Sequence, residues 1–172
     1  MYELHENEQY FFDEETLGHL SEFVSQFQAP CCVCCPLLGQ RLSEMGVPVT
    51  ILDIDERFGK TPGFRHYDIY RPEWLGLEFD LIVCDPPFFN VSLSQLFAAI
   101  RILARNDFQQ PVLISYLHRR ANAILGTFAP FEIRPTGFFP TYQTVQDSEK
   151  NRIEFFSNLP ETEIRRLSTR SS

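Results

Sequence analysis

The chain has 172 residues, which suit one domain and leave no room for a second substantial one. Hydrophobic residues make up 44% of it, enough for a core, yet no apolar run approaches the roughly 18 residues of a membrane helix. The net charge of −8 argues against a generally basic nucleic-acid binder. Because the first residues lack the basic and apolar start of a signal peptide, we expect a cytoplasmic protein without a membrane partner.

The negative charge is concentrated near the N-terminus. Residues 1–40 carry seven carboxylates and no Lys or Arg, whereas residues 41–172 carry 16 acids and 15 bases. An ordinary solvated surface is the simplest explanation of the arginines that follow residue 97. Their planar forks also suit phosphate, so the charge permits a polyanion on one face. That face would carry Arg101, Arg105, Arg119 and Arg120.

Four of the five cysteines fall within residues 31–35. Two overlapping Cys-x-x-Cys spacings resemble half of a zinc site, but the segment is apolar and no second pair of ligands accompanies it. We therefore expect a buried strand and no metal. Five thiols indicate a reducing compartment.

The first predicted elements are a helix, a strand and a second helix. Asp13 caps the first helix, whose acidic first turn suits the helix dipole and whose apolar residues recur at helical spacing. Pro30 ends it. Residues 31–35 suit a buried strand, and residues 37–45 have helical character up to Gly46.

Three further strands are predicted at residues 47–54, 64–67 and 79–84. A double proline stops the last of them abruptly. Ser92 and Gln95 then form a capping box for a helix with one apolar face.

The C-terminal part changes character. Residues 111–116 are a fifth strand, and residues 117–125 a helix that ends at a glycine. Residues 131–139 and 152–156 flank a polar turn at residues 147–151, which predicts a hairpin.

Strands that alternate with helices predict an α/β fold with a mostly parallel sheet, helices on both faces and an added antiparallel hairpin. This core spans residues 31–160. Residues 1–30 form a helix and a lid before it, and residues 161–172 a flexible polar tail after it. Ligands of such sheets bind outside the carboxyl ends of the strands, where the strand order switches.

Three predicted strands end in an aspartate. Asp53 can accept both hydrogen bonds of a ribose diol, as an acid at the second strand does in dinucleotide folds. Ile54 beside it could pack on an adenine face, and Asp68 could accept from an adenine amino group. One such residue is explained by a surface turn, but aspartates at successive strand ends predict a nucleoside-containing cofactor.

Asp85-Pro86-Pro87-Phe88 follows the fourth strand and carries the most chemistry. Two prolines fix φ and provide no N–H, so the loop is stiff. The Asp85 carboxylate and the Pro86 carbonyl could draw the protons of an amino group and direct its lone pair to a methyl sulfonium. Phe88 offers a flat face to a base. The loop therefore predicts methyl transfer by orientation, without a metal, although a strand-ending turn also explains Asp-Pro.

Asp85-Pro86-Pro87-Phe88 resembles the [DNS]-P-P-[FYW] motif of class I amino methyltransferases, which methylate exocyclic amino groups of nucleobases. Residues 9–16, Gln-Tyr-Phe-Phe-Asp-Glu-Glu-Thr, resemble the N-terminal segment of the probable N6-adenine methyltransferase family. Further similar segments are Cys35-Pro36-Leu37-Leu38, residues 52–58, His66-Tyr67-Asp68 and residues 152–160, the last resembling the ribosomal-RNA branch with CCHC zinc fingers.

The resemblance implies a seven-stranded Rossmann-like class I fold and S-adenosylmethionine as the cofactor. It places cofactor contacts at Tyr10, Phe11, Cys35 and Pro36, beside Asp53, Ile54 and Asp68, and a catalytic loop at Asp85, Pro86, Pro87 and Phe88. It also implies transfer to adenine N6, with RNA favoured over duplex DNA because a splayed base needs no flipping.

Two departures limit the resemblance. A Gly-x-Gly sequence after the first strand is missing, and so are the zinc fingers of the ribosomal-RNA branch. A ribosomal particle or a partner protein would then supply affinity for RNA. Two alternatives stay open: a protein lysine methyltransferase, since a sister branch with DPPY modifies an elongation factor, and a non-catalytic RNA-binding or partner subunit.

Overall fold

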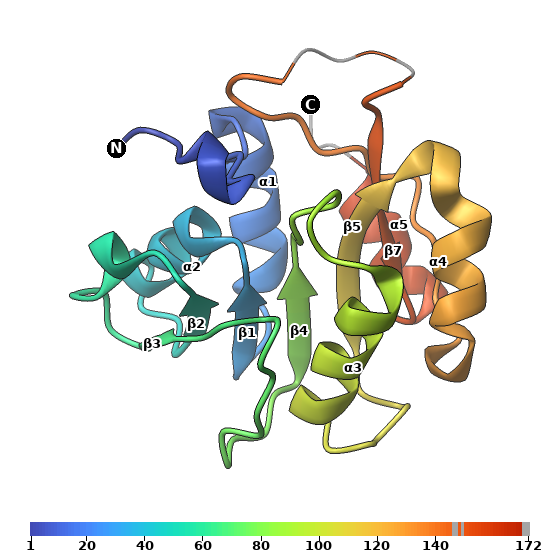
Figure 1. Cartoon of the computed structure of the whole chain (residues 1–172), viewed down its shortest axis with the longest axis horizontal. Helices are drawn as coiled ribbons and strands as arrows, with labels where there is room; N and C mark the ends of the chain where they lie inside the picture. The colour runs from blue at the N-terminus through green and yellow to red at the C-terminus, as the bar shows by residue number, and fades with distance from the viewer. Residues whose placement is uncertain (146–147, 149, 170–172) are drawn as a thin grey trace.

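A computed structural model describes residues 1–145, 148 and 150–169 (Figure 1). A seven-stranded sheet forms its centre, with strand order β3-β2-β1-β4-β5-β7-β6. Strands β1 to β5 run parallel, and β6 and β7 add the antiparallel pair. The predicted sheet and its closing hairpin are confirmed. The strands are β1 (Pro30–Val33), β2 (Thr50–Asp53), β3 (Phe64–His66), β4 (Leu81–Cys84), β5 (Val112–Leu117), β6 (Arg134–Pro135) and β7 (Ile153–Ser157).

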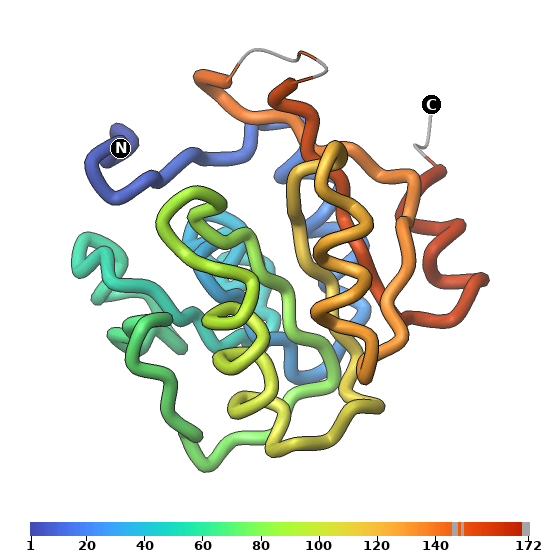
Figure 2. Tube along the Cα trace, turned by 45° about the vertical axis from the view of Figure 1, so that its right-hand side comes forward, coloured from blue at the N-terminus to red at the C-terminus, as the bar shows by residue number. Residues whose placement is uncertain are grey.

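The helices cover both faces of this sheet. Helices α1, α2 and α5 pack together on one face, and α3 and α4 pack together on the other (Figures 1 and 2). The α-helices are α1 (Glu14–Val24), α2 (Pro36–Glu44), α3 (Leu93–Leu103), α4 (Ala121–Thr127) and α5 (Glu161–Ser168). Single 3-10 turns are η1 (His5–Asn7), η2 (Glu56–Phe58), η3 (His118–Arg120) and η4 (Ala129–Phe131). No helix in the described part of the chain is long and apolar enough to cross a membrane.

The central strands are buried on both faces, which explains their continuous apolar sequence. The chain leaves β1 towards β2 and β3 on one side, then returns to β4 on the other side of β1. The strand order therefore switches between β1 and β4, and this is where such sheets bind ligands.

Two predicted helix starts are confirmed. The Asp13 side chain accepts a hydrogen bond from the backbone N–H of Thr16 and caps α1. Ser92 and Gln95 form a complete capping box for α3, with Oγ of Ser92 accepting at 3.1 Å from the backbone N–H of Gln95. Because α3 begins directly after the β4 loop, this cap also fixes the end of that loop.

Three boundaries differ from the prediction. Strand β2 begins only at Thr50, since the backbone N–H of Val47 still bonds to the end of α2. Strand β5 runs through Leu117, so α4 starts later and continues past Gly126. Strand β6 has two residues, and its proline offers no N–H to a further partner. The expected polar turn includes residues 147 and 149, which lie outside the described residues.

The tail expected to be flexible from residue 161 onward instead forms α5 over Glu161–Ser168. Ile164 and Leu167 lie three residues apart on one face of this helix and are both buried. Helix α5 packs against α1, where an imidazole nitrogen of His19 lies 2.5 Å from the Leu167 carbonyl. The segment is mostly polar, so the two apolar residues that form a narrow buried stripe on the helix were not recognised in the sequence.

Candidate active site

A cavity of about 300 Å³ opens at the carboxyl ends of β1, β2 and β4, where the strand order switches. The loops that follow these strands line the cavity together with residues 6–10 of the N-terminal segment. Figure 2 shows the course of this segment, in blue, before α1. Its walls are Glu6, Asn7, Glu8, Gln9, Tyr10, Cys34, Asp53, Ile54, Asp55, Tyr67, Asp68, Ile69, Tyr70, Asp85, Pro86, Pro87, Phe88, Asn90 and Tyr142.

The structure brings most of the predicted site residues to this cavity: Tyr10, Asp53, Ile54, Asp68 and the four residues of the loop at 85–88. The other three, Phe11, Cys35 and Pro36, line a hollow of only about 10 Å³ next to it, which shares Tyr10 and Asp85 with the cavity. Phe11 is buried and packs its ring edge-on against Phe58. These three residues therefore lie beside the cavity and not on its wall.

Asp53 ends β2 and is 8% exposed. Its Oδ1 accepts a hydrogen bond of 2.8 Å from the backbone N–H of Asp55. Burial raises the pKa of Asp53 to about 6, and the neighbouring carboxylate of Asp55 acts in the same direction. Asp53 is thus a partly desolvated acceptor whose charge depends on pH near neutrality.

Asp68 is partly exposed and already takes part in a turn. Its Oδ1 accepts at 2.9 Å from the backbone N–H of Tyr70. The surface-turn explanation therefore holds for this residue, and its position on the cavity wall adds a possible second use.

Asp85 is buried at the end of β4, and two hydroxyls converge on one of its oxygens. Oδ1 accepts from Oγ of Ser115 at 2.5 Å and from the hydroxyl of Tyr142 at 2.8 Å. Burial raises the pKa of Asp85 to about 7, although both hydrogen bonds favour the ionised form.

The two proline carbonyls of the loop differ in their partners. The Pro87 carbonyl accepts at 3.1 Å from the backbone N–H of Val91. The described residues make no hydrogen bond to the Pro86 carbonyl, which stays available on the cavity wall. Phe88 meets the ring of Tyr116 edge-on, with 5.8 Å between centroids. The loop therefore presents a carboxylate, a carbonyl and an aromatic face together.

The N-terminal segment is tied to this loop and to the residues around 141–145. The Glu8 carboxylate accepts from the backbone N–H of Phe89 at 2.9 and 3.2 Å. Glu3 accepts at 2.6 Å both from the backbone N–H of Phe11 and from the hydroxyl of Thr144. On the other side, Gln9 donates to Asp55 at 2.8 Å. These contacts hold residues 3–11 across the mouth of the cavity.

Comparison with known proteins points to methyltransferases. The sequence profile described as probable N6-adenine methyltransferase matches residues 3–160. The chain belongs to this family. No curated protein sequence matches the chain significantly.

Several solved structures with a similar fold are methyltransferases as well. Magnesium protoporphyrin IX methyltransferase from Synechocystis PCC 6803, with bound SAM, has a TM-score of 0.56 at 15% identity and covers 83% of this chain and 78% of its own. A TehB-like SAM-dependent methyltransferase from Corynebacterium glutamicum has a TM-score of 0.56 at 12% identity, covering 81% and 85%. The N-methyltransferase NodS from Bradyrhizobium japonicum, with S-adenosyl-L-homocysteine, has a TM-score of 0.51 at 15% identity, covering 84% and 86%. Family and fold identify the chain as a methyltransferase of the S-adenosylmethionine-dependent class, whose cofactor is S-adenosylmethionine.

This methyltransferase makes its first turn without a Gly-x-Gly sequence. Cys34, directly after β1, has a left-handed φ of 61°, and its backbone N–H donates at 3.0 Å to the Leu52 carbonyl. A cysteine thus takes the conformation for which glycine is usually needed. Its backbone and side chain lie on the cavity wall, a role that sequence analysis missed.

The cysteines of the family member are free thiols. Burial raises the pKa of Cys31, Cys35 and Cys84 well above the ordinary value, which makes them poor nucleophiles. Within residues 1–145, 148 and 150–169, no group of three or more potential ligands could hold a metal ion. The absence of zinc stays a prediction.

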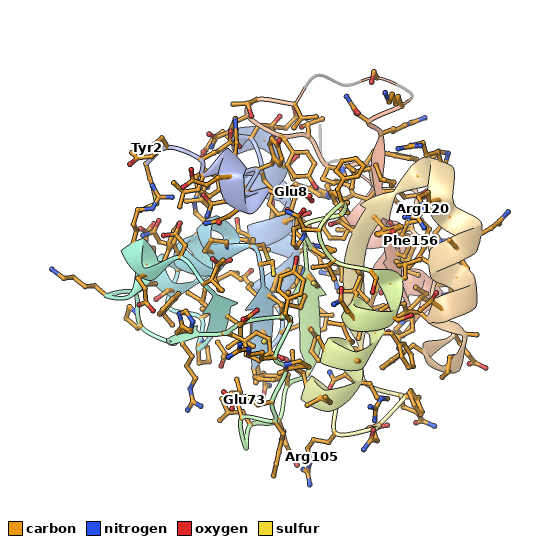
Figure 3. All side chains as sticks on the ribbon, in the orientation of Figure 1. Tyr2, Glu8, Glu73, Arg105, Arg120 and Phe156 are labelled. Carbon is orange, nitrogen blue, oxygen red and sulfur yellow. The ribbon has the colours of Figure 1, made fainter. Side chains whose placement is uncertain are left out.

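The structure separates the four arginines expected on one face. Arg101 and Arg105 lie at or just after the C-terminal end of α3, towards the amino ends of the parallel strands and away from the cavity. Arg119 and Arg120 instead follow the carboxyl end of β5 (Figure 3 labels Arg105 and Arg120). Arg105 pairs with Glu78 at 2.6 Å. The two groups of arginines cannot contact one short substrate together.

Arg119 and Arg120 also differ from each other. Arg120 donates at 2.7 Å to the hydroxyl of Tyr116, the residue that packs on Phe88. Arg119 is exposed, and the described residues offer it neither a hydrogen bond nor an ion pair. Of these two arginines, Arg119 is therefore the one whose guanidinium is fully available to a ligand.

Proposed function

We propose that this methyltransferase transfers a methyl group to N6 of an adenine in RNA. The observation that carries the proposal is the loop at residues 85–88, where a buried carboxylate, an unbonded carbonyl and an aromatic ring border one cavity. An exocyclic amine needs these three features, because its lone pair is conjugated with the ring until its protons are drawn away.

The cavity suits the proposed cofactor. Its volume of about 300 Å³ reaches the lower limit of small-molecule sites, and its wall is rich in carboxylates and lacks Lys and Arg among the described residues. S-adenosylmethionine carries a sulfonium and an ammonium, so an acidic wall favours it. It supplies an electrophilic methyl group when bound.

Three residues would orient the adenosine part. Asp53 would accept from the two ribose hydroxyls, and Ile54, which is 45% exposed, would cover one adenine face. Asp68 would accept from the adenine amino group with the oxygen that does not serve the turn. Tyr10 lies on the same wall, while Phe11, Cys35 and Pro36 would support the cofactor only from the neighbouring hollow.

The protein residues act on the acceptor by holding and drawing protons. Oδ2 of Asp85 and the Pro86 carbonyl would each accept one N–H of the amine, so the lone pair points at the methyl group. As the N–C bond forms and the C–S bond breaks, the amine becomes cationic and loses a proton to Asp85 or to solvent. Phe88 would hold the base in place by stacking.

RNA is the proposed source of the adenine because the exposed Arg119 directly follows the carboxyl end of β5, which runs parallel to β4, and the cavity opens at the carboxyl end of β4. An overall charge of −8 makes binding of free RNA weak and sensitive to salt. A ribosomal particle or a partner protein would then supply the remaining affinity, as the resemblance implies.

The decisive experiment uses tritiated methyl groups. The protein is incubated with labelled cofactor and with cell fractions, which are then digested with RNase or with protease. We expect label that RNase releases and that co-elutes with N6-methyladenosine. Label that only protease releases would contradict the RNA proposal. Cofactor binding without transfer to any fraction would identify a non-catalytic subunit.

A matched pair of variants tests the RNA surface. We expect Arg119→Gln to lower the transfer to RNA and to reduce the salt dependence by about one phosphate contact. Arg105→Gln removes the same charge at the opposite end of the strands, away from the cavity, and should leave the transfer to RNA unchanged. Equal effects of the two variants would refute an RNA path over Arg119.

A protein lysine is the second candidate acceptor, and the acidic wall favours it specifically. Glu6 and Glu8 stand at the mouth of the cavity and would attract a cationic side chain. In this case Arg119→Gln would not reduce transfer, and the label would resist RNase.

A further inference from the structure

Asp85 receives both of its hydrogen bonds on a single oxygen. Ser115 reaches Oδ1 from the neighbouring strand β5, and Tyr142 reaches the same atom from the segment that follows β6. Among the described residues none donates to Oδ2. The two donors therefore divide the carboxylate into one oxygen that is held and one that is free.

Both donors are themselves fixed. Ser115 is fully buried within β5, whose neighbours on the two sides are β4 and β7. Tyr142 is 9% exposed, forms an isolated bridge with Phe12 and packs its ring 5.2 Å from the Phe12 ring. Such packing leaves the hydroxyls little freedom to leave Asp85.

Among the residues that the structure describes, no cation faces Asp85 and could take over this task. The titratable groups facing it are the Tyr142 hydroxyl and the thiols of Cys35 and Cys84, all of which are buried and neutral. The hydroxyls of Ser115 and Tyr142 are therefore the groups that favour the ionised carboxylate against the cost of burial.

We propose that Ser115 and Tyr142 are positioning residues, which fix the plane of the Asp85 carboxylate by donating to Oδ1 and so aim Oδ2 at the acceptor amine. Neither residue touches the substrate in this role. The inference rests on the proposed function for its consequence in catalysis, but the arrangement itself is independent of the acceptor.

The test compares Tyr142→Phe, Ser115→Ala and the double variant with wild-type enzyme. A hydrogen bond to a charged group contributes enough that kcat should fall about 10- to 100-fold for each single variant. The KM for S-adenosylmethionine should stay unchanged. Because each hydroxyl favours the ionised form, the acid limb of the kcat–pH profile should move above pH 7.

Ser157→Ala is the matched control for the serine. Ser157 is also fully buried, on β7, and donates its hydroxyl at 2.6 Å to the Val112 carbonyl without contacting Asp85. We expect this variant to keep the wild-type kcat and pH profile per folded molecule.

A second measurement does not depend on turnover. The carboxyl carbon of Asp85 is titrated by NMR in protein labelled with ¹³C-aspartate, with Asp85→Asn to assign the signal. The inflection should rise from about pH 7 in Tyr142→Phe and in Ser115→Ala. If RNA is not methylated but the inflection rises, the arrangement stands and the proposed acceptor fails. An unmoved inflection, or an activity loss no larger than in Ser157→Ala, would overturn the inference.

Discussion

Asp53 is the residue whose charge should control cofactor affinity. It accepts from the backbone N–H of Asp55 and lines the cavity, and its ionised form is needed to accept from two ribose hydroxyls. Asp53→Asn should weaken the binding of S-adenosylmethionine by about 2–3 kcal/mol.

The pH dependence sharpens this prediction. Since the pKa of Asp53 is raised to about 6, protonation below pH 6 should weaken binding in the wild-type enzyme but not in Asp53→Asn. Calorimetry between pH 5 and 8 checks both expectations. Asp107→Asn, in an exposed turn at the opposite sheet edge, is the control. Unchanged affinity in Asp53→Asn would remove Asp53 from the cofactor site.

Phe88 should act on the acceptor alone. Stacking of a base on an aromatic ring contributes about 1–3 kcal/mol, so Phe88→Ala should raise the KM for the acceptor about 5- to 150-fold. Phe88→Tyr keeps the flat ring and its edge contact with Tyr116, and should stay close to wild type. Steady-state kinetics with cofactor and acceptor varied separately distinguish this effect. An equal loss in both variants would contradict stacking.

At the scale of single residues, the sequence located the residues at strand ends that line the cavity, while their roles stay predictions. Asp53 and Asp85 follow apolar runs directly, and local patterns locate such residues. Ser115 and Tyr142 lie 30 and 57 residues from Asp85 along the chain, so no spacing rule connects them to it. The place of Cys34 on the cavity wall was not predicted for another reason, because a left-handed φ at a cysteine has no sequence signature.

Among the elements, the buried strands and capped helices were predictable because their causes are local. Apolar runs mark β1, β2, β4 and β5, and a complete capping box marks α3. Helix α5 was missed because its two buried apolar residues give a weak pattern, and the helix packs against α1, which lies far away in sequence.

The N-terminal segment is the element that should control access to the cavity. Glu8 joins it to the backbone of Phe89, directly after the loop at residues 85–88. In Glu8→Ala we expect faster hydrogen exchange at residues 4–11 and a faster release of the cofactor. Glu22→Ala, an exposed glutamate on α1, is the control. Exchange that is unchanged at the segment, with unchanged release, would show that Glu8 does not hold it.

The molecule as a whole places its chemistry at one edge of the sheet. Loops after β1, β2, β3 and β4 meet there, and the segment between β6 and β7 brings Tyr142 to the same end before β7 runs back antiparallel to β5. The opposite end of the strands carries Arg105 and its pair with Glu78, whereas Arg119 and Arg120 follow the carboxyl end of β5, so the arginines do not gather at one place. Net charge is therefore a poor guide to the substrate of this protein.

The burial of Asp85 has a consequence for how the free energy of unfolding depends on pH. A carboxyl whose folded-state pKa lies near 7, against 3.8 when exposed, favours the fold fully below pH 3.8 and loses this contribution as pH rises through 7. At about 1.4 kcal/mol for each pKa unit, the ionised side chain costs up to about 4 kcal/mol at pH 8. In denaturant unfolding, Asp85→Asn and wild type should have equal free energies of unfolding near pH 4, and the variant should be more stable at pH 8. Equal free energies of the two proteins at pH 8 would contradict this. A screen for thermostable variants, run at alkaline pH without an activity assay, would accordingly select substitutions that neutralise Asp85. Under the proposed function these variants lack methyl transfer.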